Sequence, residues 1–265
     1  MEMARKAGHE VYGVDRKPIL TDYPEDWEVH SEGDISEFKV LQDHLLQGPR
    51  GSRLDAIVHL AGSTSTIRSM KRPYQAFRDN VVTMANICQI AEVLRIPILS
   101  TSSVKARDGM TPYGASKRMA ELWASELRGV CDMTIVINRP GTVYGPGQEG
   151  SAESGWIAWF LKAKAEGFPV TINGDGDHVR DLLHVDDYCR LLLVQLGDLG
   201  RYSLGVWDVG GGVDNAVSVR YMATHLGLEY IFGPPRHGDA ARYVGHNLMD
   251  DWKPQIHWRD SGMFD

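Results

Sequence analysis

The sequence predicts an α/β fold in which a doubly wound parallel sheet carries a smaller C-terminal lobe. Short apolar runs rich in Val and Ile alternate with longer amphipathic segments through the first half of the chain. After Gly141 this alternation loosens into loops and shorter elements. Alternating β and α elements favour a parallel sheet with helices on both faces. The looser second half indicates a lobe added to that sheet.

The expected strands are the short apolar runs, and the expected helices are the segments between them. The strands of the sheet are predicted over residues 10–15, 56–60, 96–100 and 134–137. Apolar residues at three- and four-residue steps predict helices over residues 35–45, 74–93 and 113–127. The second half predicts loops over 145–155, a helix over 156–166, and strands near 170–172 and 204–209.

The two parts of the fold are expected to share the chain in alternation. Residues 1–140 are predicted to form the sheet domain, and residues 178–212 return to it. The lobe is predicted from residues 141–177 and 213–265. Because no internal repeat and no Pro/Ser-rich linker is visible in the sequence, we expect both parts to form one compact body.

Composition excludes several classes of protein. Of the 265 residues, 28 are Lys or Arg and 35 are Asp or Glu, which gives a net charge of −7 without a basic stripe. Nucleic acid is therefore not expected as a partner. No apolar run is long enough for a membrane span or a secretory leader, so we expect a cytoplasmic protein. Three scattered cysteines predict neither a disulfide framework nor a metal site.

Side chains able to do chemistry follow the expected strands. In an open α/β sheet, ligands bind beyond the carboxyl ends of the strands. Ser102 and Ser103 follow one such strand, and Thr111-Pro112 is a plausible helix start. Tyr113 and Lys117 then lie four residues apart, which stacks them on one helix face. A nearby ammonium lowers the pKa of a phenol and would make Tyr113 a base. Alone, this spacing also occurs on many ordinary helices.

These motifs occur in an order that resembles one known family. The matching stretches are Gly13-Val-Asp15-Arg16, Gly33-Asp34-Ile35, His59-Leu-Ala61-Gly62 with Ser69 and Pro73, Asn80-Val81, Ser102-Ser103, Tyr113-Gly-Ala-Ser-Lys117, Arg139-Pro140, Val143-Tyr-Gly-Pro146, Gly174-Asp-Gly176, Arg180-Asp181 and Val185-Asp-Asp187. Over nearly its whole length, the chain resembles an extended short-chain dehydrogenase/reductase of the NAD-dependent sugar epimerase/dehydratase family. The resemblance implies a Rossmann-type dinucleotide-binding domain and a lobe that binds substrate.

The resemblance implies NAD as cofactor. The residues implied to contact it are Asp15, Arg16, Asp34, Ile35, Leu60, Ala61, Gly62, Asn80, Tyr113 and Lys117. Asp15 would bind the adenosine ribose and favour NAD, although the adjacent Arg16 could tolerate the 2′-phosphate of NADP. Asp34 and Ile35 would flank the adenine. Asn80 would hold the backbone of the active-site helix, and a buried, hydrogen-bonded asparagine is an equally fair interpretation.

The implied catalytic residues are Ser103, Tyr113 and Lys117. Tyr113 would take a proton from a sugar hydroxyl while hydride leaves the sugar for the nicotinamide. Lys117 would bind the nicotinamide ribose and lower the pKa of Tyr113. Ser103 would hydrogen-bond the reacting oxygen, with Ser102 as the alternative.

The nucleotide-sugar subset of the family implies substrate contacts as well. Arg180 and Arg236 would bind the diphosphate, with a surface salt bridge as the alternative for each. Thr142 stands where many epimerases have an asparagine that touches the nucleotide. Dehydratases of the family carry acidic residues directly after the catalytic Ser/Thr. Val104 and Lys105 occupy those places here, so dehydration is disfavoured.

One departure from the family pattern lies at the start of the chain. A glycine-rich fingerprint opens roughly 20 residues or more before the ribose acid, and Asp15 leaves no room for it. We expect residues 1–7 to be the last turns of the first helix, with Gly8 as its C-cap. Truncation of a working enzyme and a shortened paralogue are the two explanations. Unpaired strand edges predict poor stability or aggregation unless another segment fills the gap.

Together these features predict an NAD-dependent nucleotide-sugar epimerase, acting at C4 through a 4-keto sugar with Tyr113 as base. A ketosugar reductase of the same family and a catalytically inactive sensor are the alternatives. The resemblance also implies a homodimer that pairs helices 74–93 and 113–127 as a four-helix bundle. The apolar faces of these helices could equally pack against the sheet.

Overall fold

The computed structural model describes residues 1–16, 30–46, 53–245, 249 and 252–264. Its centre is a parallel four-stranded sheet in the order β3-β4-β5-β9. The strands are β3 (Ile57–His59), β4 (Ile98–Thr101), β5 (Ile135–Pro140) and β9 (Val206–Val209). Each lies within or beside a run predicted from its apolar residues. The α/β fold class expected from the sequence is therefore confirmed.

A second parallel pair lies beside this sheet. It consists of β1 (Gly13–Asp15) and β2 (His30–Glu32), in which Asp15 is the register partner of Glu32. Among the described residues, neither strand pairs with β3. Val58 of β3 and the following Leu60 are 41% and 56% exposed. Apolar strand surface is thus open to solvent here, whereas strands of parallel sheets are ordinarily covered on both faces.

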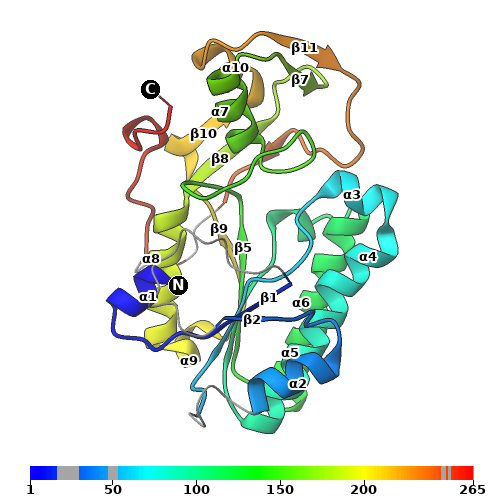
Figure 1. Cartoon of the computed structure of the whole chain (residues 1–265), viewed down its shortest axis with the longest axis vertical. Helices are drawn as coiled ribbons and strands as arrows, with labels where there is room; N and C mark the ends of the chain where they lie inside the picture. Colours follow the sequence, from blue (N-terminus) through cyan, green and yellow to red (C-terminus); the bar gives the residue numbers. More distant parts are fainter. Residues whose placement is uncertain (17–29, 47–52, 246–248, 250–251, 265) are drawn as a thin grey trace.

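Helices cover both faces of the central sheet (Figure 1). One face carries α2 (Phe38–Leu46), α5 (Thr83–Leu94) and α6 (Pro112–Val130). The other carries α8 (Val185–Gly197) and α9 (Leu199–Tyr202), with the N-terminal α1 (Glu2–Lys6) against α8. Gly8 follows α1 with a φ of 90°, in the left-handed region expected of a glycine after a helix. The helix predicted at the start of the chain is present, but its C-cap is Ala7, and Gly8, predicted as the C-cap, is the next residue.

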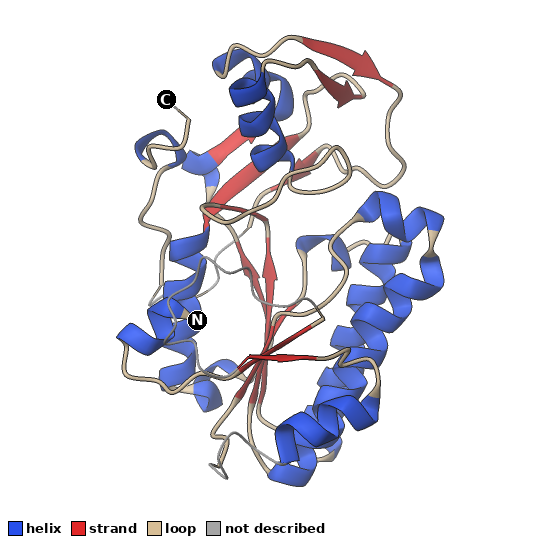
Figure 2. Cartoon of the chain, in the orientation of Figure 1, coloured by secondary structure: helices blue, strands red, loops and turns tan. Residues whose placement is uncertain are grey.

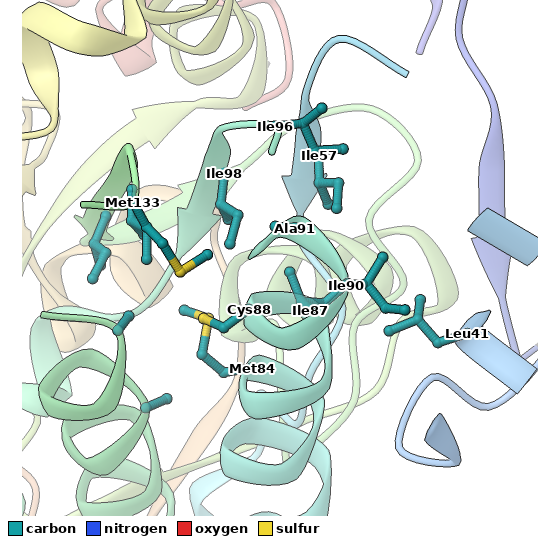
Figure 3. Close-up of a cluster of buried hydrophobic side chains, with 14 residues drawn as sticks. Leu41, Ile57, Met84, Ile87, Cys88, Ile90, Ala91, Ile96, Ile98 and Met133 are labelled. Atoms are coloured by element: carbon teal, nitrogen blue, oxygen red, sulfur yellow. The ribbon is translucent and has the colours of Figure 1, made fainter. Parts of the chain in front are cut away.

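Two apolar clusters hold these layers together. Between the sheet and α5 and α6, fourteen buried side chains form one cluster, which includes Met84, Ile87, Ile98 and Ile135 (Figure 3). On the opposite face, Leu99 and Val136 pack with residues of α8 and α9. Successive strand residues therefore point to opposite faces and are buried on both.

The helix predicted over 74–93 is divided by a wider turn. Its parts are α4 (Pro73–Phe77), the π-helical segment η2 (Arg78–Val82) and α5. A short helix, α3 (Thr66–Lys71), precedes it. Single π-helical turns inside α-helices are common at functional sites. Residues 78–82 were predicted only as ordinary helix.

The smaller lobe has its own mixed sheet (Figure 2). Its strands are β6 (Thr142–Tyr144), β8 (Val179–His184), β10 (Ala216–Ser218) and β12 (Arg242–Tyr243), and the other three all pair with β8. Its further elements are α7 (Trp156–Glu166), β7 (Val170–Asn173), α10 (Val219–His225), β11 (Tyr230–Gly233) and the short helices η4 (Val213–Asn215) and η5 (Trp258–Asp260). The return to the central sheet was expected from residue 178. Because β8 pairs within the lobe, the return begins with α8 at Val185.

No helix in the described part of the chain is long and apolar enough to cross a membrane.

Candidate active site

The first turn of α6 presents the Tyr/Lys pair. Thr111 caps the helix, because its hydroxyl accepts the backbone N–H of Gly114 at 3.1 Å, and Pro112 fills the first position. Tyr113 and Lys117 follow one turn apart, and each is 7% exposed. The local sequence signals at this helix start therefore predicted the geometry correctly.

Tyr113 is held by neighbours on two sides. Its backbone N–H donates to Ser69 Oγ of α3 at 3.0 Å. Burial raises the pKa of the Tyr113 phenol, and a hydrogen bond with the Ser103 hydroxyl lowers it in part. Ser103 caps the short helix η3 (Val104–Ala106), where its Oγ accepts the N–H of Lys105 at 3.3 Å. Ser103, the residue expected to touch the reacting oxygen, thus lies beside Tyr113.

The pKa of Tyr113 is not lowered as the nearby Lys117 led us to expect, because burial outweighs the opposing hydrogen bond. Lys117 Nζ donates to the Thr101 carbonyl at 3.2 Å, and the net direction of the Tyr113 pKa is upward. Burial also lowers the pKa of Lys117 to about 8, against an opposing attraction to Glu121. Desolvation disfavours the charged form of both groups, which spacing along a helix cannot reveal.

Sequence reasoning missed a buried carboxylate behind this pair. Glu121, one turn beyond Lys117, accepts hydrogen bonds from Ser102 Oγ and, at 2.8 Å, from Arg139 Nε. Ser102 therefore turns toward Glu121, while Ser103 turns toward Tyr113. The available signal was the continuation of the four-residue spacing from Tyr113 through Lys117 to Glu121.

A cavity of about 340 Å³ opens beside β1 and β3. Its walls are Val14, Asp15, Arg16, Gly33, Asp34, Ile35, Leu60, Ala61, Gly62, Asp79 and Thr83. Seven of the predicted cofactor residues therefore line one space, although they come from three separate stretches of sequence. In its wall, Arg16 Nη1 lies 3.1 Å from Asp79 Oδ1.

The Gly62 turn joins this cavity to α6. Asn80 Oδ1 accepts the N–H of Ser63 at 3.0 Å, and its Nδ2 donates to Ser116 Oγ of α6 at 2.8 Å. A Cβ at Gly62 would lie 2.6 Å from Asn80 Oδ1 and 3.1 Å from Lys117 Nζ. Only glycine permits this close approach. Asn80 is buried and is not among the residues that line the cavity.

Three of the predicted substrate residues lie in the lobe, whereas the fourth, Ser103, lies beside Tyr113. Arg180 of β8 is buried, where Nη2 contacts Asp239 Oδ1 at 3.0 Å and the guanidinium lies 4.9 Å from the Tyr243 ring centre. Arg236 is exposed in the loop after β11 and donates to the Ala152 carbonyl at 3.1 Å. Thr142 lies on β6, opposite Leu182 of β8.

Comparison with known proteins identifies the family. A model of the NAD dependent epimerase/dehydratase family matches residues 1–205. The chain belongs to this family. It is 27% identical over 278 residues to a UDP-glucose 4-epimerase of Mycolicibacterium smegmatis, covering 94% of this chain and 87% of that protein. It is 26% identical to a CDP-paratose 2-epimerase of Salmonella typhi, covering 58% of this chain and about half of that protein's length.

Solved structures of other proteins share the fold. A Thermus thermophilus UDP-glucose 4-epimerase in complex with NAD superposes with a TM-score of 0.85 at 23% identity, covering 99% of this chain and 92% of that one. Pal from Bacillus thuringiensis gives a TM-score of 0.89 at 19% identity, covering 98% and 91%. The order of elements therefore matches across nearly the full length of each chain.

The described residues fit the two ends of a dinucleotide. The cavity is the size of a small-molecule site and has a carboxylate, Asp15, at its wall for a ribose hydroxyl. At its Gly62 corner it adjoins the Lys117 ammonium, which can donate to a second ribose. The family is described as NAD dependent, in keeping with this arrangement.

Proposed function

We propose that this chain is an NAD-dependent nucleotide-sugar epimerase acting at C4. The observation that carries the proposal is the meeting of Ser103, Tyr113 and Lys117 beside a cavity lined by seven predicted cofactor residues. A base, a hydrogen-bond donor and a cation together suit reversible oxidation of a secondary alcohol.

Each residue has a defined part in this reaction. Bound NAD supplies the hydride acceptor and donor. Tyr113 takes the proton of the C4 hydroxyl as the sugar becomes a 4-keto sugar, and it returns a proton when the other epimer forms. Ser103 hydrogen-bonds the same oxygen. Lys117 binds ribose hydroxyls of the cofactor, and Arg180 and Arg236 hold the diphosphate.

The raised pKa of Tyr113 sets a condition on this mechanism. As a phenol, Tyr113 can donate a proton, but it must ionise or transfer its proton to act as a base. We therefore expect the rate of sugar oxidation to rise with pH above neutrality as Tyr113 ionises. Above about pH 8 the Lys117 ammonium loses its proton, which limits the gain.

The test is direct interconversion of substrate. The chain with NAD and UDP-glucose is expected to form UDP-galactose, with dTDP- and CDP-glucose tried in parallel, and NMR follows the anomeric signals. Tyr113→Phe should lower the rate by about 100-fold or more. Tyr74→Phe is the matched control, since Tyr74 is 73% exposed on α4. Sugar binding without turnover under all conditions would favour the sensor, and stoichiometric consumption of NADH with a ketosugar would favour the reductase.

A homodimer is part of the proposal. The outer faces of α5 and α6 expose Val93, Met119, Leu122 and Trp123, while their inner faces pack on the sheet. Large exposed apolar patches mark interaction surfaces. Trp123→Asp should shift sedimentation equilibrium toward monomer, whereas Val213→Asp, on η4 of the lobe and 70% exposed, should not. A wild-type chain that sediments only as monomer would contradict the dimer.

A further inference from the structure

Lys105 is a half-buried cation directly beside the reaction site. It lies on η3, two residues beyond Ser103, and its backbone N–H donates to Ser103 Oγ at 3.3 Å. Its side chain is 22% exposed. Lys105 Nζ contacts Thr66 Oγ1 at 3.2 Å and Asp239 Oδ1 at 3.5 Å. The ammonium thus bridges α3 of the sheet domain and the loop after β11 of the lobe.

Short hydrogen-bonded links connect this ammonium to Tyr113. Thr66 begins α3, and its carbonyl accepts a hydrogen bond from Ser69 Oγ at 2.7 Å. The same Ser69 Oγ accepts the N–H of Tyr113 at 3.0 Å. The Lys105 ammonium therefore contacts Thr66 at the start of α3, and the backbone of Tyr113 contacts Ser69 one turn later. The Lys105 ammonium and the Tyr113 backbone thus share α3, and Lys105 follows Ser103 by two residues.

The charges around Lys105 leave a positive excess. Asp239 is shared by Lys105 and by Arg180, whose Nη2 lies 3.0 Å from the same carboxylate oxygen. Two cations thus divide one anion, and Arg236 adds a third positive charge to the surroundings of Lys105. His178 also acts on Asp239. Because Lys105 shares the Asp239 carboxylate with Arg180, a further bound anion would stabilise its partly buried ammonium, since desolvated charges are stable only when paired.

We propose that Lys105 recognises a negative charge on the sugar, so that the substrate is a nucleotide-linked sugar acid. The inference rests on the proposed function and deepens it. In a hexuronate the carboxylate is attached to C5, next to the reacting C4. Because Ser103 is proposed to hydrogen-bond the C4 oxygen, we infer that the side chain of Lys105, two residues further on, reaches the carboxylate on the neighbouring C5. With Arg180 and Arg236 engaged by the diphosphate, Lys105 Nζ keeps its contacts with Thr66 and Asp239, and the third hydrogen of the ammonium can be donated to the carboxylate.

Calorimetry with three matched probes tests this inference. UDP-glucuronate, UDP-glucose and UDP differ only in the carboxylate and the sugar, and each is titrated into the full chain with NAD present. The wild type should bind UDP-glucuronate about tenfold or more tightly than UDP-glucose, as expected for one charge-assisted contact. Lys105→Gln should remove this preference and leave the affinities for UDP-glucose and UDP within about twofold. Lys105→Arg should retain it.

The controls separate the possible failures. Lys71→Gln removes an exposed ammonium that contacts Glu153 and should change none of the three affinities. Equal affinities of the wild type for the two sugars would overturn the role of Lys105 and leave the proposed function intact. Equal weakening of all three probes by Lys105→Gln would make Lys105 a diphosphate ligand and would also overturn it. Failure of every probe to bind would overturn both this inference and the proposed function.

Discussion

Replacing the buried Lys117 by methionine should stabilise the fold while removing activity. Burial lowers the pKa of Lys117 from its ordinary 10.5 to about 8 in the folded chain. At about 1.4 kcal/mol for each pH unit, this difference corresponds to a cost of about 3 kcal/mol for holding the ammonium inside at neutral pH. Methionine has a similar length and carries no charge.

Two losses offset part of that gain. The Thr101 carbonyl loses its hydrogen bond from Lys117, which costs about 1 kcal/mol. Glu121 loses an attractive neighbour but keeps its contacts with Arg139 and Ser102. We therefore expect Lys117→Met to raise the free energy of unfolding by about 2 kcal/mol at pH 7.

The stability difference between wild type and Lys117→Met should depend on pH. Between pH 8 and 10.5 the unfolded chain binds more protons at Lys117 than the folded chain does, so wild-type stability gains from this group as pH rises. The variant has no such group, and its advantage should therefore shrink across this window. Urea unfolding at pH 7, 8, 9 and 10 measures the difference, with the exposed Lys39→Met as control. A variant that is less stable at pH 7, or a difference that stays constant from pH 8 to 10, would refute the argument.

Three further predictions concern buried polar groups. Asn80→Ala should lower the free energy of unfolding by about 2 kcal/mol in urea titrations, because it breaks two hydrogen bonds and leaves a backbone N–H unpaired. Glu121→Ala should cost about 2–3 kcal/mol, since it removes the carboxylate that accepts two hydrogen bonds from Arg139 and leaves that guanidinium its 3.9 Å contact with Asp208, and unchanged thermal unfolding would contradict this. The pKa of Asp239 is lowered, because its cationic neighbours outweigh the opposing effect of burial. Wild-type stability should therefore fall below about pH 4 more steeply than that of Asp239→Asn, as followed by circular dichroism.

The sequence predicted the parts of the site that depend on local signals. Thr111 and Pro112 mark a helix start by their own chemistry, and the spacing from Tyr113 to Lys117 fixes a common face. The central strands were predicted because each is a short, β-branched run. The cavity residues were grouped by resemblance to a family, since nothing local relates Asp15 to Gly62.

Other features depend on tertiary contacts that no local pattern contains. The π-helical turn at η2 has an apolar pattern close to that of an ordinary helix. The pKa of Tyr113 depends on how completely the folded chain covers it, and the spacing to Lys117 alone gave the opposite direction. The boundary before β8 was misjudged, because a short apolar strand can join either sheet and only pairing decides which.

The charges behind Tyr113 illustrate how local and distant signals combine. Helix spacing brings Lys117 and Glu121 onto one face. The Glu121 carboxylate, however, accepts a hydrogen bond from Arg139, which lies on β5 and is distant in sequence. Arg139 is in turn the register partner of Asp208 on β9, and its Nη1 lies 3.9 Å from that carboxylate. Asp208 accepts a further hydrogen bond at 3.0 Å from Nε of Arg107, just beyond η3. Charges of alternating sign therefore run from the buried ammonium to a partly exposed guanidinium. The ammonium that we propose to bind ribose is consequently supported by strand register, which no single motif encodes.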